Sequence, residues 1–139
     1  MAYYVVVDTN VLVSALLSKN NNSSTVKILD AVFDGKIIPL YHKDILAEYD
    51  EVLHRKKFHL KEETIQLVLC AIQQYGIEVF PALTEEILID EDDRIFYETA
   101  VEMRVNNAYL VTENQKHYPI RDFIVTPAAM ADIIDKNDK

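Results

Sequence analysis

The hydrophobic positions of the chain alternate between short, uniformly apolar runs and longer stretches with helical spacing. The run Tyr-Tyr-Val-Val-Val at residues 3–7 has no polar position on either face, which is typical of a strand buried inside a parallel sheet. Strands that alternate with helices predict a parallel sheet covered on both faces. The predicted strands are residues 3–7, 37–41, 77–80, 108–111 and 122–125.

The segments between these strands carry apolar residues at helical spacing. Ser23 or Ser24 can cap one helix that ends near Gly35, and Thr126 followed by Pro127 supplies the cap and first position of the last helix. The predicted helices cover about residues 11–17, 24–34, 43–57, 61–75, 93–105 and 128–134. The pattern therefore predicts an α/β three-layer sandwich with a central parallel sheet of about five strands, formed by residues 1–139 as one domain.

Composition narrows the class of protein. The chain has 139 residues, of which 50% are hydrophobic and 27% charged, as in an ordinary globular domain. Two glycines cannot form a Gly-rich phosphate loop. A single cysteine, Cys70, excludes an internal disulfide and favours a reducing, cytoplasmic location. We expect neither a signal peptide in residues 1–18 nor a membrane span.

The net charge of −9 argues against non-specific coating of DNA. The negative net charge does not exclude chemistry on nucleic acid, because clustered carboxylates can hold cations that then bind phosphate. Basic residues concentrate at 54–59 and at 116–117. Each of these lysines and arginines can equally be a solvated residue at a helix end.

Three acidic side chains stand at positions where chemistry is expected. Asp8 ends the first strand, where ligand crevices of α/β sheets form, although the segment 8–10 could equally turn the chain and cap a helix. Glu48 lies at the margin of an apolar stripe that includes Ile45 and Tyr49. A carboxylate there needs a cation or hydrogen-bond donors, unless its side chain reaches water.

The third candidate lies in the acidic run at residues 90–93. Acids at a helix N-terminus satisfy free N–H groups, and Asp92 alone could be that cap. Asp93 instead begins an apolar face, because Phe96 and Ala100 follow it at helical spacing. Four consecutive acids repel one another, which favours a bound cation nearby.

These acids can meet at one edge of the sheet. If the first and fourth strands are neighbours, Thr112 and Asn114 emerge beside Asp8, and Asp8, Glu48 and Asp93 can share a cleft. Oxygen ligands without His or Cys suit Mg²⁺ or Mn²⁺, and such a site can activate water and neutralise a phosphodiester. The candidates for phosphate contacts are Lys116 and His117, with Arg55 or Lys43 as further ones.

Four motifs in this order resemble the PIN domain family, and in particular the VapC-type ribonuclease toxins. The motifs are Val-Val-Asp-Thr-Asn-Val-Leu-Val-Ser-Ala-Leu (6–16), Ile-Leu-Ala-Glu-Tyr-Asp-Glu-Val-Leu (45–53), Asp-Glu-Asp-Asp-Arg-Ile-Phe-Tyr-Glu-Thr-Ala (90–100) and Ala-Tyr-Leu-Val-Thr-Glu-Asn (108–114). The resemblance implies a doubly wound sheet and a metal-dependent endoribonuclease. It implies that Asp8, Glu48 and Asp93 bind the metal, that Asn10 and Thr112 support them, and that Asp90 is an extra contact.

One position departs from the family pattern. Many members have a fourth acid where this chain has Asn114, which would hold a second metal more weakly unless Glu113 or Asp90 substitutes. The resemblance also implies an RNA substrate, an antitoxin protein and a homodimer. The alternatives are a catalytically weak PIN-like protein-interaction module and, more distantly, a phosphoryl-transfer receiver or phosphatase. The latter lacks support, since no acid pair stands beside Asp8.

Overall fold

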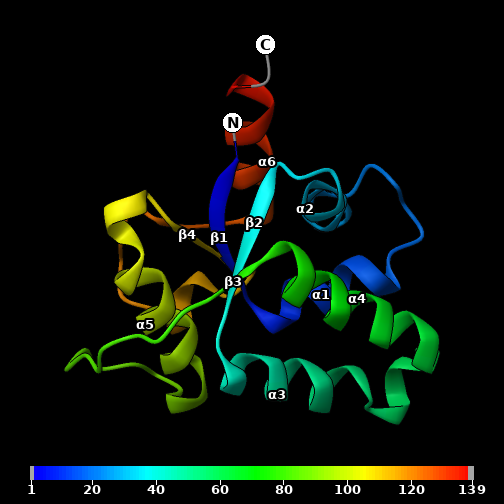
Figure 1. The fold of residues 1–139 in the computed structure, drawn as a ribbon, viewed down its shortest axis with the longest axis horizontal. Helices are drawn as coiled ribbons and strands as arrows, with labels where there is room; N and C mark the ends of the chain where they lie inside the picture. Colours follow the sequence, from blue (N-terminus) through cyan, green and yellow to red (C-terminus); the bar gives the residue numbers. More distant parts are fainter. Residues whose placement is uncertain (1, 138–139) are drawn as a thin grey trace.

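The central layer of the protein is a five-stranded, fully parallel sheet (Figure 1), seen in a computed structural model that describes residues 2–137. The strand order is β3-β2-β1-β4-β5. The strands are β1 (Tyr3–Val7), β2 (Ile37–Tyr41), β3 (Ile77–Glu78), β4 (Tyr109–Val111) and β5 (Ile124–Val125). The predicted fold class is therefore confirmed.

Helices cover both faces of this sheet. The α-helices are α1 (Thr9–Leu17), α2 (Ser24–Phe33), α3 (Lys43–Leu53), α4 (Glu62–Tyr75), α5 (Arg94–Glu102) and α6 (Pro127–Asn137). Short 3₁₀ turns are η1 (Lys56–Phe58), η2 (Glu91–Asp93), η3 (Arg104–Asn106) and η4 (Gln115–His117). In Figure 1, α5 lies on one side of β1 and β2, and α1, α2 and α4 lie on the other. Helix α3 runs across the carboxyl ends of the strands.

Strand β1 lies at the centre of the core, as its uniformly apolar sequence predicts. Val5 and Val6 have no exposed surface, although their side chains point to opposite faces of the sheet. Two predicted helix starts are also confirmed. The Ser23 hydroxyl accepts a hydrogen bond from the backbone N–H of Val26 at 3.4 Å, and Thr126 accepts one from Ala129 at 3.1 Å.

Several predicted boundaries are wrong. Helix α3 ends at Leu53 rather than near Lys57, because the ring of His54 bonds to the Asp50 carbonyl and to Glu62 at the start of α4. Helix α5 is shorter at both ends than predicted, β3 and β5 have two residues each, and α1 already begins at Thr9. The cap of the acidic turn is Asp90, whose side chain accepts from the Asp92 backbone, rather than Asp92 itself.

Among residues 2–137, no helix has the length and apolar character needed to cross a bilayer.

Candidate active site

The carboxyl ends of β1 and β4 form the edge at which the candidate site lies. The two strands are parallel neighbours, with Val7 opposite Val111, and the backbone N–H of Asp8 donates to the Val111 carbonyl at 3.0 Å. The chain leaves β1 toward β2 on one side and returns to β4 on the other. Such a reversal of strand order opens a crevice outside the strand ends.

Asp8 is buried at this edge and held by hydroxyl groups. The Thr112 hydroxyl donates to Asp8 Oδ2 at 2.6 Å, and the Tyr118 hydroxyl lies 3.4 Å from the same oxygen. The backbone N–H of Asn114 in turn donates to Thr112 Oγ1 at 2.9 Å. Burial raises the pKa of the Asp8 carboxyl despite these donors. The bonds fix the orientation of a carboxylate that is only 5% exposed.

Glu48 lies on α3, and two hydrogen bonds connect this helix to the residues on either side of Asp8. The buried Tyr49 hydroxyl donates to the Val7 carbonyl, and the Thr9 hydroxyl donates to the Glu48 carboxylate. Burial, followed by the negative charge of Asp8, raises the pKa of Glu48, while the Thr9 bond partly opposes this. A glutamate at the margin of the apolar stripe is thus turned toward Asp8.

Asp93 completes the group at the start of α5. Its side chain is 15% exposed, and its Oδ2 atom lies 3.3 Å from Nδ1 of His117. Burial, and then the charges of Asp8 and Asp90, raise the pKa of Asp93 to about 6, although His117 pulls it down. The charge of Asp8 therefore acts on both Glu48 and Asp93, so the three acids share one electrostatic environment. We call Asp8, Glu48 and Asp93 the acid cluster.

The chemistry of the acid cluster fits a hard divalent cation. Its donors are carboxylate oxygens whose charged forms are disfavoured by burial and, for Glu48 and Asp93, also by the charge of Asp8. A cation reverses this penalty. Within residues 2–137, no group of three or more His, Cys, Asp or Glu side chains is already gathered closely enough to coordinate an ion. Mg²⁺ is commonly held by one or two carboxylates with water in its other positions, which the acid cluster can supply.

The other predicted site residues lie at the rim. Asn10 is exposed on the first turn of α1, and Asn114 is half-buried after β4. Arg55 lies with both asparagines around one pocket beyond the end of α3. Asp90 is exposed and caps η2, and its negative charge raises the pKa of Asp93. Lys116 is exposed on η4, next to His117.

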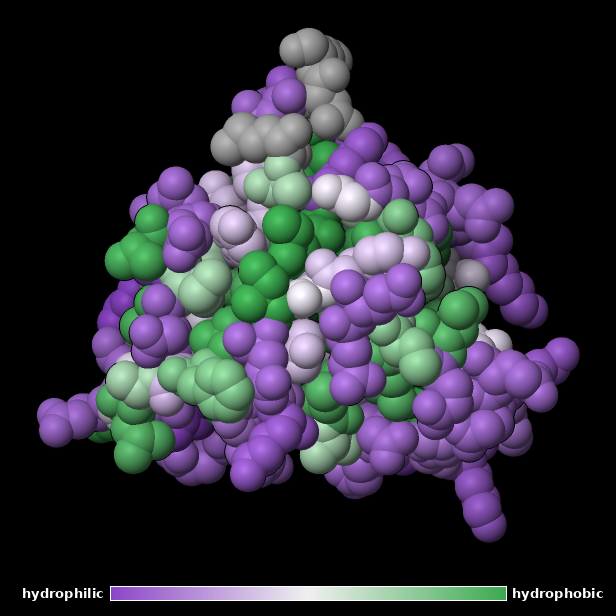
Figure 2. Space-filling model, in the orientation of Figure 1, coloured by the Kyte–Doolittle hydropathy of each residue, from purple (hydrophilic) through white to green (hydrophobic). Residues whose placement is uncertain are grey.

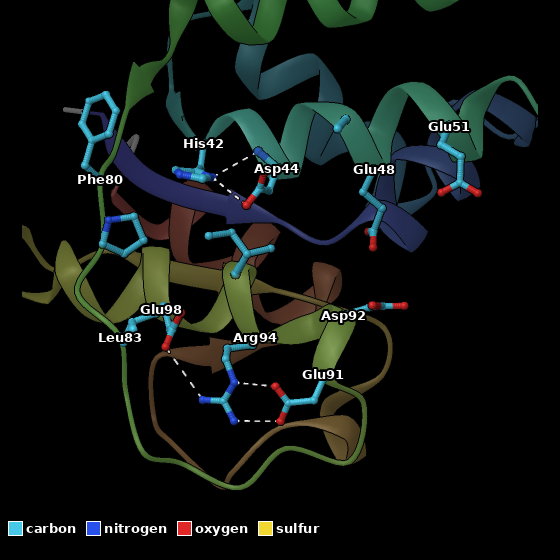
Figure 3. Close-up of a pocket in the computed structure, with 13 residues that line it drawn as sticks. His42, Asp44, Glu48, Glu51, Phe80, Leu83, Glu91, Asp92, Arg94 and Glu98 are labelled. Carbon is cyan, nitrogen blue, oxygen red and sulfur yellow. Dashed lines mark hydrogen bonds and ion pairs between the residues drawn. The ribbon is translucent and has the colours of Figure 1, made fainter.

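A second pocket, of about 790 Å³, includes Glu48 in its wall and has an acidic lining (Figure 3). We call it the acidic pocket. In Figure 3, Glu48 and Glu51 extend from α3 toward the side that carries Asp92 and Glu91. Arg94 is the arginine of this lining, and it pairs with Glu91 at 2.7 Å and with the buried Glu98 at 3.8 Å. A lining of this charge disfavours a polyanion.

Sequence reasoning missed two residues that shape the site. Tyr118, at the end of a polar loop, has no periodicity or motif that links it to Asp8, which lies 110 positions away. Tyr49 was predicted only as a residue of the apolar stripe, and its hydroxyl contact with Val7 has no signature in the sequence. Burial raises the pKa of both phenols, so each stays a neutral hydrogen-bond donor.

Comparison with known proteins gives a family match and a relative of similar sequence. A family model described as PIN domain matches residues 4–116. An uncharacterized protein of Methanocaldococcus jannaschii, MJ1680, is 33% identical over 121 residues, which cover 85% of this chain and 75% of that protein.

Proposed function

Because the chain belongs to the PIN domain family, whose members are generally nucleases that use divalent metals, we propose that it is a metal-dependent endoribonuclease. One observation carries the proposal: three buried or half-buried acids from distant segments, the acid cluster, lie near the carboxyl ends of β1 and β4. Burial raises the pKa of each, and the charge of Asp8 raises the pKa of Glu48 and of Asp93 further. A bound cation would favour the charged forms of these carboxylates.

In this proposal Asp8, Glu48 and Asp93 hold Mg²⁺ or Mn²⁺. A cation bound there would supply Lewis acidity toward a phosphodiester and a water of lowered pKa. Thr112 and Tyr118 fix the carboxylate plane of Asp8, and Thr9 fixes that of Glu48. His117 keeps Asp93 turned toward the cluster. Asn10, Asn114 and Asp90 are outer contacts, and Lys116 and Arg55 meet phosphates of the substrate.

The resemblance to VapC-type ribonucleases extends the proposal to the toxin of a toxin–antitoxin pair, with an antitoxin protein as partner and a homodimer as assembly. Induced expression of the chain in a bacterial host tests the toxin role. We expect growth arrest that Asp8→Asn relieves, and unimpaired growth at full expression of the wild type would contradict it.

The catalytic proposal is tested with Asp8→Asn, which removes the charge and keeps the shape. We expect RNA cleavage in Mn²⁺ to fall by about a hundredfold or more, because a buried charged ligand is lost. Asp132→Asn, an exposed aspartate on α6, is the matched control and should cleave like the wild type. Cleavage by Asp8→Asn at the wild-type rate would exclude the mechanism.

Calorimetric titration with Mn²⁺ separates this function from the alternative, a PIN-like module that only binds proteins. The nuclease should take up Mn²⁺ at micromolar to millimolar concentration, and Asp8→Asn should bind it more weakly. A chain that binds no Mn²⁺ in this range, yet is folded, would favour the interaction module.

A further inference from the structure

A pocket of about 510 Å³ lies beside the segments that follow β1 and β4, and it shares no lining residue with the acidic pocket. Its inner wall is formed by Asn10, two residues after Asp8, and by Asn114, whose backbone N–H binds the Thr112 hydroxyl that in turn holds Asp8. Its outer wall comes from the end of α3 and from η1. The outer lining consists of Val52, Arg55, Lys57 and Phe58. We call it the basic pocket.

The early end of α3 is what brings cations and an aromatic ring to this wall. The helix stops at Leu53, η1 follows, and His59 adopts a left-handed conformation with φ of 52°. If the helix continued to Lys57, Arg55 and Lys57 would project from roughly opposite sides of it, because an α-helix has 3.6 residues per turn. Instead, Arg55 and Lys57 line the pocket together with the ring of Phe58.

The charges around this wall suit a nucleic-acid strand. The Lys57 ammonium lies 5.1 Å from the centroid of the Phe58 ring, and Arg55 is exposed with a weak contact to Glu51 at 3.4 Å. Both cations can therefore turn to a phosphate at little cost. Glu113 also lines the pocket, but its carboxylate accepts a hydrogen bond from Ser14 at 2.6 Å, which draws it to that wall.

We propose that the basic pocket binds the nucleotide next to the bond that is cut, in a single-stranded nucleic acid. Arg55 and Lys57 contact the phosphate, the base packs on the half-buried Phe58 ring, and the amides of Asn10 and Asn114 contact the sugar or base edge. A paired base in a duplex is stacked between its neighbours and cannot reach the ring. The inference rests on the proposed function, and it adds the residues that receive the strand and the side from which the strand enters.

Binding is measured by fluorescence anisotropy in EDTA, with a labelled 12-nucleotide RNA that is either single-stranded or annealed to its complement. We expect the single strand to bind more tightly than the duplex. Arg55→Gln combined with Lys57→Gln should weaken single-strand binding about tenfold and flatten its dependence on salt concentration. Phe58→Leu should weaken it about five- to tenfold and leave the salt dependence unchanged.

Matched controls separate the pocket from general charge and from misfolding. Lys27→Gln combined with Lys61→Gln removes two exposed cations elsewhere and should change single-strand affinity less than twofold. Thermal melting verifies that every variant is folded. The inference is overturned if this control weakens binding as much as the pocket variant does, or if Phe58→Leu affects single strand and duplex alike. Equal binding of polyglutamate would also overturn it, since the pocket would then be a general anion site.

The assay also distinguishes this inference from the proposed function. Binding in EDTA that depends on Phe58, in a wild type that does not cleave RNA with Mn²⁺, would reject the nuclease and retain the pocket. Cleavage that is lost in Asp8→Asn but unaffected by the variants of the basic pocket would retain the nuclease and reject the pocket.

Discussion

The acidic pocket contains Glu48 of the acid cluster, the basic pocket contains Asn10 and Asn114, which follow β1 and β4, and α3 lines both pockets. Helix α3 gives Asp44, Glu48 and Glu51 to the acidic pocket, and its last turn and the segment beyond it give Val52 and Arg55 to the basic pocket. Asp44 in the first turn of α3 suits the helix dipole, but Asp50 and Glu51 lie in the last turn, which contains no basic residue. Helix stability alone therefore does not explain the difference in charge between the two pockets.

The two sides also differ in their apolar surface. Figure 2 shows hydrophobic side chains at the lower left, over the segment that follows β3, and a mainly hydrophilic surface at the lower right, where α3 ends. Phe80 and Leu83 belong to the first region, with exposed fractions of 75% and 89%, and both line the acidic pocket. The phosphate backbone of a nucleic acid is thus expected to approach from the side of the basic pocket. The acidic pocket differs in having exposed apolar residues and a negatively charged lining.

The largest effect is expected from Asp93→Asn, a change between the two pockets. Cleavage with Mn²⁺ should fall by about a hundredfold or more, because a cation ligand loses its charge.

In EDTA the same variant should be more stable than the wild type at pH 7. The folded-state pKa of about 6 exceeds the ordinary 3.8, so the folded protein retains this proton where the unfolded chain has lost it. Stability of the wild type therefore falls as pH rises from about 4 to 7.

The measurement is a series of thermal melts of both proteins between pH 4 and 7, without metal and with Mn²⁺. The raised pKa corresponds to at most about 3 kcal/mol, and less after solvent screening. The advantage of the variant should grow toward pH 7 and disappear when Mn²⁺ is present. An advantage that is the same at pH 4 and pH 7 would contradict the electrostatic account of the acid cluster.

The second effect concerns the wall of the acidic pocket. Arg94 donates to the carbonyls of Thr84 and Glu86 at 3.0 and 2.6 Å and pairs with Glu98, whose side chain is 4% exposed. Arg94→Met leaves that carboxylate without its cation, and we expect a loss of roughly 2–4 kcal/mol of unfolding free energy in urea. Arg121→Met removes an exposed pair with Glu86 and should cost less than about 1 kcal/mol.

The Arg94→Met variant also tests whether the acidic pocket and the cation site are independent. Mn²⁺ should raise the melting temperature of Arg94→Met by as much as that of the wild type, since Arg94 contacts none of the acid cluster in the described hydrogen bonds and ion pairs. If the variant lost this response, the acidic pocket and the cation site would be one structural unit.

The contrast between the two sides shows which features a sequence can predict. The uniformly apolar β1 and the caps Ser23 and Thr126 are local signals, and the structure confirms them. The approach of Thr112 to Asp8 follows once β1 and β4 pair, because parallel strands end at a common edge. Each of these inferences needs only periodicity, capping and sheet geometry.

The end of α3 could not be predicted, although it forms the basic pocket. No glycine or proline marks it, and the residue that turns the chain with positive φ is His59 rather than glycine. The helix is closed instead by His54 with Glu62, a contact to the next helix. Tyr118 was missed for a similar reason, since its contact with Asp8 depends on packing between distant segments. Both features arise from tertiary structure alone.

The smallest expected effect comes from the border between the pockets. Glu51 lines the acidic pocket and holds Arg55 of the basic pocket at 3.4 Å. Glu51→Gln removes one negative charge and releases Arg55, so we expect single-stranded RNA to bind about two- to threefold more tightly at low salt and equally at high salt. The melting temperature should hardly change, because exposed pairs of this kind contribute less than about 1 kcal/mol.

Glu63→Gln is the matched control, since it removes the same charge from an exposed position in the first turn of α4. It should raise affinity less than Glu51→Gln does, because it does not pair with a residue of either pocket in the described ion pairs. Anisotropy at two salt concentrations measures both variants. If the two gain affinity equally, net charge rather than the border between the pockets governs how a strand approaches, and the distinction between the acidic and the basic side has no consequence for binding.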